Sequence, residues 1–228
     1  MTRYFTPEVF KFLRELEANN NREWWEANKS RYVERIREPA LDFIADFSEK
    51  LGSISPHFAG DTRVNGGSLM RPYRDLRFAK DKTPYKSNVG IQFRHRRGKD
   101  VHAPGFYVHI APGQNFIGAG MWQPEARVAR MIRQAIHDDP DGWGLAAHSN
   151  EFEAVWSIDD NDRLQRTPRE LDSEHPYPDD LRLKSFTAAR PITQRTVTSA
   201  GFADELLESF TAAGPYTRFL TEAIGVAF

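Results

Sequence analysis

The sequence predicts an α+β fold, with a mainly antiparallel sheet flanked by N-terminal and C-terminal helices. Three observations lead to this expectation. Apolar residues recur at helical spacing up to residue 52, alternate with polar residues in short segments between residues 89 and 121, and return to helical spacing near the C-terminus. No internal repeat, low-complexity tract or linker separates these parts, so we expect a single domain over residues 1–228.

The N-terminal part reads as three helices. Thr6 is a good capping residue with Pro7 at the first helical position, and three asparagines at 19–21 end that helix. The last of these asparagines caps a second helix, which we expect to end before Pro39 because proline disfavours a preceding helical residue. A third helix then runs from Pro39 to a stop at Gly52.

Three strands follow, at Val89–Arg94, Gly105–Ala111 and Asn115–Met121, each with apolar residues at every second position. Their connections are short, which favours an antiparallel meander. In the second strand the alternation places Tyr107 and His109 on the face opposite the apolar residues.

An amphipathic helix begins at Pro124 and ends in a turn at residues 138–142. Its pattern predicts that Met131 faces the core and Arg133 faces solvent.

The remainder predicts a short helix at Asn150–Trp156, irregular chain at 157–182, a last strand at Leu183–Arg190, and two helices divided at Gly214-Pro215.

Composition narrows the class of protein. The chain has 228 residues, 39% of them hydrophobic and 28% charged, with a net charge of −1 and no cysteine. Disulfides and thiolate metal sites are therefore excluded, and a soluble, cytoplasmic protein is expected, with no membrane partner. The seven histidines lack zinc-ligand spacing, and Asp159–Asp162 lacks the glycine and distal glutamate of a calcium loop. We expect no metal and no cofactor.

The net charge hides a strong asymmetry along the chain. Residues 71–99 carry ten Lys or Arg against two Asp, a balance of +8. Residues 138–180 carry thirteen Asp or Glu against three Arg, a balance of −10. Local fields, rather than the overall charge, therefore indicate the partners.

The segment Arg71–Lys86 holds six cations and two carboxylates, with two prolines and three aromatic residues. Arginine binds phosphate or carboxylate with two donors, and lysine adds a mobile point charge. We interpret the segment as an anion site for a phosphate-bearing small molecule or nucleic acid. Its proposed binding residues are Arg74, Arg77, Lys80, Lys82 and Lys86, with Asp75 and Asp81 orienting the cations and Tyr85 stacking on the ligand.

Two alternatives remain open for this segment. In one, the protein is an enzyme acting on a small phosphorylated or carboxylated substrate, with Asp75 or Asp81 as general base beside a lysine of lowered pKa. In the other, the charges form an internal salt-bridge lattice that fixes a loop. Neither a Walker loop nor a nucleophile elbow is present, so the reaction, if any, is not indicated.

Two further segments are candidates. Gly118 and Gly120 lie at the end of the third strand, before a helix N-terminus, and glycine allows a ligand to approach the backbone closely; a β-bulge explains the same residues. The basic run Arg94–Lys99 is either a solvated hairpin loop or an extension of a nucleic-acid surface.

Several of these motifs together resemble a known family. They are Asn20-Asn21, Trp24-Trp25, Tyr32, the string Arg74-Asp75-Leu-Arg77-Phe78-Ala-Lys80-Asp81-Lys82-Thr83-Pro84-Tyr85-Lys86, Gly105-Phe-Tyr107, and Gly118-Ala-Gly120-Met-Trp122-Gln-Pro124. The chain resembles domain-of-unknown-function family 2461 over nearly its whole length, with Trp25 where the family more often has phenylalanine. The resemblance implies a single-domain soluble protein and assigns no role to the motif residues.

Overall fold

The computed structural model describes residues 2–77, 80–98, 103–171 and 174–228 and confirms the α+β class. Its sheet has six antiparallel strands in the order β1-β2-β3-β4-β6-β5. The strands are β1 (Phe58–Ala59), β2 (Val89–His95), β3 (Gly105–Ile110), β4 (Phe116–Met121), β5 (Ser157–Ile158) and β6 (Phe186–Pro191). The three predicted meander strands are thus present, and the predicted last strand is β6.

Helix α1 (Pro7–Ala18) is followed by one long helical segment, made of α2 (Arg22–Tyr32), the π-helical turn η1 (Val33–Arg37) and α3 (Glu38–Leu51). The break predicted before Pro39 is therefore wrong. A proline ring crowds the carbonyl four residues earlier and removes one amide donor. The wider π turn accommodates this, since the Glu38 amide bonds back to the Val33 carbonyl.

The second half of the chain adds α4 (Ala126–Asp138), α5 (Pro140–Ala147), α6 (Asn150–Glu153), the 3-10 turn η2 (Asp180–Arg182), α7 (Gln194–Val197), α8 (Phe202–Ala212) and α9 (Gly214–Ala223). Helix α5 replaces the turn predicted at residues 138–142, because the Asp139 side chain caps the Gly142 amide and Pro140 occupies the first helical position.

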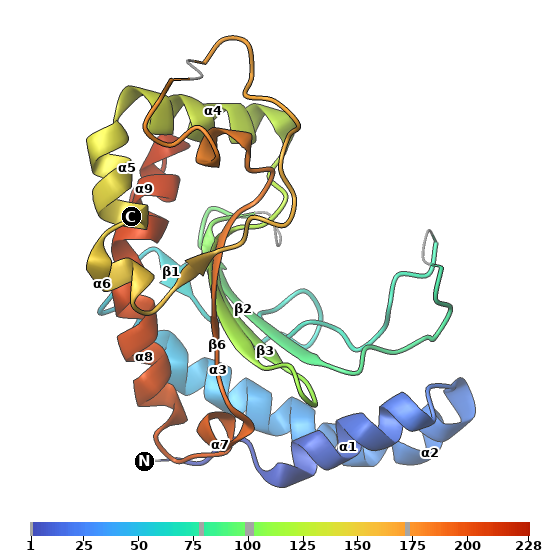
Figure 1. The fold of residues 1–228 in the computed structure, drawn as a ribbon. Coiled ribbons are helices and arrows are strands. Elements are labelled where there is room, and N and C mark those ends of the chain that lie inside the picture. The colour runs from blue at the N-terminus through green and yellow to red at the C-terminus, as the bar shows by residue number, and fades with distance from the viewer. Residues whose placement is uncertain (1, 78–79, 99–102, 172–173) are drawn as a thin grey trace.

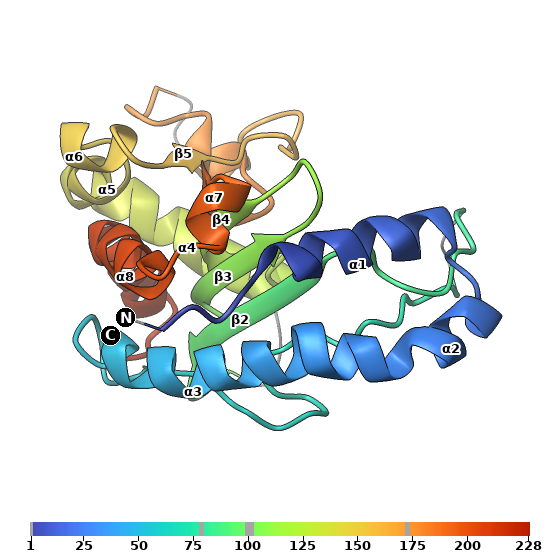
Figure 2. The same ribbon diagram turned by 90° about the horizontal axis from the view of Figure 1, so that it is seen from below.

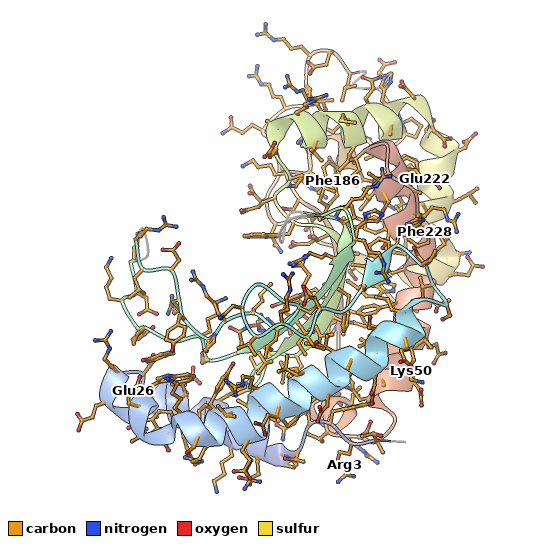
Figure 3. The ribbon with its side chains drawn as sticks, turned by 180° about the vertical axis from the view of Figure 1, so that it is seen from behind. Arg3, Glu26, Lys50, Phe186, Glu222 and Phe228 are labelled. Atoms are coloured by element: carbon orange, nitrogen blue, oxygen red, sulfur yellow. The ribbon has the colours of Figure 1, made fainter. Side chains whose placement is uncertain are left out.

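The predicted orientation of α4 is also corrected. Arg133 is buried, with 7% of its surface exposed, whereas Met131 is exposed. The Arg133 guanidinium donates to the Leu183 carbonyl at 2.6 Å and lies over the Phe186 ring, which Figure 3 labels below α4. A backbone acceptor and an aromatic face together compensate the burial of this cation.

One face of the sheet packs on helices. Phe93 of β2 lies against Phe47 of α3, and Phe106 of β3 against Phe210 of α8, with ring centroids 5.0 and 4.6 Å apart. In Figure 1, α3 and α8 lie on this side of the sheet. The other face is turned towards α4, the loops that follow it and the segment 71–86, which we call the arm (Figure 1).

The arm is hairpin-like. Tyr73 and Tyr85 form an antiparallel bridge, and the Lys86 amide donates to the Pro72 carbonyl at 2.7 Å. Figure 3 shows it rising from the α1–α2 end of the molecule, near the labelled Glu26. None of the helices in the described part of the chain has the length and apolar character needed to cross a membrane.

Candidate ligand-binding pocket

The face of the sheet opposite α3 and α8 has a depression that runs across the strands. Strand register places Gln92, Tyr107, Gly118 and Ala189 side by side in one row. Gln92 and Tyr107 carry large side chains, whereas Gly118 and Ala189 carry none or a single methyl group, so the surface of the sheet is lower at β4 and β6. A cavity of about 510 Å³ occupies the depression. That volume is in the range of small-molecule sites.

The two glycines predicted to allow close approach both line this cavity. A Cβ atom at Gly118 would lie 3.6 Å from the Tyr107 Cβ, which is ordinary contact distance. Gly120 has a φ of +112°, and a Cβ atom there would come within 2.1 Å of the Phe186 carbonyl oxygen. Gly120 is therefore required by the backbone, whereas Gly118 leaves space that a ligand can fill.

Lys86 is the motif cation that lines the cavity. Its side chain is half-buried, and desolvation, followed by repulsion from Arg71, lowers the pKa of its ammonium group. Within the described ranges, no hydrogen bond or ion pair engages the Lys86 Nζ atom. This positive charge is thus held beside an apolar cavity, and no residue that the structure describes acts as its counter-ion.

The base of the arm fixes the position of Lys86. The Tyr85 ring stacks on Trp25 with centroids 4.4 Å apart and an interplanar angle of 15°. The Asn20 side chain accepts from the Tyr85 amide at 3.0 Å and donates to the Tyr85 carbonyl at 2.9 Å. With 3% of its surface exposed, Tyr85 stacks within the protein, so its predicted role in stacking on a ligand is corrected.

Two arginines at the tip of the arm, by which we mean residues 74–77 and 80–83, are paired with its two aspartates. Arg77 binds both oxygens of Asp75, at 3.0 Å and 2.6 Å, and Arg74 bonds to Asp81 and Thr83. None of these residues lines the cavity. The two arginines predicted to clamp the ligand are therefore paired with the carboxylates predicted to orient them.

These pairs also change the chemistry of the two carboxylates. Hydrogen bonds from Arg77 lower the pKa of Asp75 to about 2, and hydrogen bonds from Thr83 and Arg74 lower the pKa of Asp81 to about 2. A carboxylate with so low a pKa is a weak base at neutral pH. The arrangement gives no support to Asp75 or Asp81 as general base.

The two other predicted cations also lie outside the cavity. The Lys82 ammonium donates to the Leu76 carbonyl at 3.0 Å, and Lys80 is exposed. In the second basic run, Arg94 and Arg96 donate to the carbonyls of Gly66 and Pro56. Phe78 and Lys99, also named in the motifs, lie outside the described residues.

Tyr107 adds a polar group to the floor. Its hydroxyl lies 3.1 Å from His109 Nδ1, and the His109 ring stacks on Phe116 with centroids 4.6 Å apart. Burial raises the pKa of Tyr107 to about 12 and lowers the pKa of His109, so both are neutral at pH 7. Strand alternation predicted that Tyr107 and His109 share this face, whereas the charge density of the sequence had indicated the arm as the binding site.

Trp122 forms a wall where β4 ends. Half of its surface is exposed and it lines the cavity. The next residue, Gln123, has a φ of +41°, a conformation rarely adopted outside glycine, and its amide donates to Ser185 Oγ at 2.9 Å. This fixed turn sets the direction in which the chain leaves the strand beside Trp122.

Searches among curated proteins and among solved structures find no match. A family match is found for residues 8–219, under the description "Conserved hypothetical protein (DUF2461)". This stretch includes the arm, the sheet and the cavity-lining residues described above. Because it covers well over half of the 228 residues, the chain belongs to the DUF2461 family.

Proposed function

We propose that the protein binds a small molecule that has a flat apolar body and a phosphate or carboxylate group. The observation that carries this proposal is the Lys86 ammonium, half-buried at a 510 Å³ cavity and without a counter-ion among the described residues. An anion on the ligand would supply the missing charge. A charge-assisted hydrogen bond of this kind contributes about 1.5–3 kcal/mol.

The shape of the cavity supports a small ligand. The small residues at Gly118 and Ala189 leave room for a flat group on the floor, and Trp122 offers an aromatic wall. A nucleotide has both parts, a phosphate for Lys86 and a base for the floor. An extended nucleic acid would need a continuous basic track, and the arginines of the arm tip are paired internally.

The test is calorimetry with adenosine monophosphate, phenyl phosphate, inorganic phosphate and a short oligonucleotide. Lys86→Met keeps the length of the side chain and removes its charge, and should weaken binding of phenyl phosphate about tenfold or more. Gly118→Val should also weaken it by filling the floor. Lys80→Met is the matched control, because Lys80 is exposed and outside the cavity.

Two results would contradict the proposal. One is an affinity for phenyl phosphate that Lys86→Met leaves unchanged. The other is equal weakening by Lys80→Met and Lys86→Met, which would favour a diffuse basic surface on the arm.

A cytoplasmic location remains a prediction, supported by the cysteine-free composition.

A further inference from the structure

The cavity has a second charged residue, Asp159, on the side opposite Lys86. Lys86 precedes β2, whereas Asp159 follows β5 and its amide donates to the Thr187 carbonyl of β6 at 2.8 Å. Strands β3 and β4 lie between β2 and β6. The edge strand β5 lies beyond β6, so four spacings of about 4.8 Å separate β2 from β5 by about 19 Å, too far for Lys86 and Asp159 to form an ion pair with each other.

Asp159 differs from the two other carboxylates of the run Asp159–Asp162. Asp160 pairs with Arg163 at 3.0 Å, and Asp162 pairs with Lys184 at 2.6 Å. The Asp159 Oδ1 atom accepts hydrogen bonds only from Asn161, and no cation contacts this carboxylate in the part of the chain that the structure describes. The carboxylate that lines the cavity is therefore the one left without an ion pair.

The arm shows the same pattern with the opposite sign. Arg74 and Arg77 are paired with aspartates, whereas Lys86, which lines the cavity, has no ion pair among the described residues. Each of the two charged segments thus places at the cavity one charge that has no ion pair among the described residues. Opposite charges at the two ends of one apolar cavity are complementary to a dipolar molecule.

Trp122 lies towards the Asp159 end. The residue after it, Gln123, bonds to Ser185, two positions before Thr187, and the Thr187 carbonyl holds the Asp159 amide. An aromatic face beside a carboxylate is a favourable environment for an organic ammonium group, which gains both cation–π and ionic attraction.

We infer that the ligand is dipolar, with an anionic group at Lys86, a flat apolar body over Gly118, and an ammonium or similar cationic group between Asp159 and Trp122. This inference rests on the proposed function, because it assigns the anionic end of the same ligand to Lys86. It narrows the class from small anions in general to amine-bearing phosphates or carboxylates.

Two probes of nearly equal shape test it: 4-(2-aminoethyl)phenyl phosphate and 4-propylphenyl phosphate, which carries a methyl group in place of the ammonium. Calorimetry on the full chain should show the amine probe binding about tenfold more tightly. Asp159→Asn should abolish this preference and leave the affinity for the propyl probe unchanged. Asp160→Asn is the matched control, because Asp160 is outside the cavity, and it should preserve the preference.

The two proposals fail in different ways. Equal affinity of the wild type for both probes, or a preference that survives Asp159→Asn, overturns the dipolar ligand while Lys86-dependent binding still supports the proposed function. Absence of binding by both probes, or binding insensitive to Lys86→Met, overturns both proposals. Thermal melting of each variant shows whether it is folded.

Discussion

The tip of the arm and the cavity on the sheet both contain charged residues, but they use them differently. At the tip, Arg77 pairs with Asp75 and Arg74 with Asp81, on side chains that water largely reaches. At the cavity, Lys86 is half-buried without a partner among the described residues. Charge density in a sequence therefore shows where ions are numerous, whereas an unpaired and partly desolvated ion marks a candidate position for ligand binding.

The base of the arm joins these two regions, and disrupting it should have the largest effect. Trp25 has 1% of its surface exposed and packs against Tyr32 as well as Tyr85. Trp25→Ala should lower the free energy of unfolding by about 3–5 kcal/mol, as measured by urea denaturation, because it opens a large cavity. Tyr73→Ala is the control: its ring is 44% exposed, and an equal loss would show that the arm packs differently.

A smaller loss is expected from Asn20→Ala. The Asn20 side chain holds the amide and the carbonyl of Tyr85, and leaving both unpaired should cost about 1–3 kcal/mol of unfolding free energy. Affinity for phenyl phosphate should also fall, because Lys86 is the next residue. Asn19→Ala removes one exposed bond to the Glu15 carbonyl and should change neither measurement appreciably. If the two variants behave alike, the arm base does not position Lys86.

Lys86→Met should stabilise the protein while it weakens ligand binding. Removing a half-buried charge without a counter-ion should raise the unfolding free energy, by less than about 1 kcal/mol because water still reaches the side chain. A loss of stability in urea denaturation would show that Lys86 has a structural partner.

The same residue predicts a pH dependence. The folded-state pKa of Lys86 lies below its ordinary value of 10.5, so the unfolded chain binds the proton more strongly. Wild-type stability should therefore rise relative to Lys86→Met as pH increases from the lowered pKa towards 10.5, and the difference should vanish above it. Binding of phenyl phosphate should weaken over the same range as the ammonium loses its charge. A difference in stability that is constant with pH would contradict this assignment.

The smallest effect is expected at the tip. Arg77 and Asp75 form an exposed pair outside the cavity, so Arg77→Ala should leave both the melting temperature and the affinity for phenyl phosphate within experimental error. A lower affinity of Arg77→Ala for phenyl phosphate would instead support the predicted role of Arg77 in anion binding.

Much of the fold follows from local pattern. Alternation predicted the three meander strands and placed Tyr107 on the face that carries the cavity. One error arose where a distant contact decides the outcome. Arg133 is charged and fits an exposed position by periodicity, but the Leu183 carbonyl, fifty residues away, allows its burial.

The candidate site was predicted only in part, for the same reason. Lys86 and the two glycines, Gly118 and Gly120, were candidates on separate motifs, and the fold brings all three to one cavity. Which arm cations are neutralised depends on the hairpin geometry of the arm, which spacing alone does not determine. The sequence showed only that Asp159–Asp162 is not a calcium loop, and it is the pairing of β5 with β6 that brings Asp159 to the cavity.

The π-helical turn η1 has a consequence for this geometry. Each residue advances an α-helix by about 100°, so the wider turn rotates everything before it relative to everything after it. The continuous helical segment can therefore pack Phe43 and Phe47 against Phe93 of the sheet and also pack Trp25 against Tyr85 of the arm. Deleting a single residue between positions 33 and 37 would keep the segment helical but rotate Trp25 away from the arm.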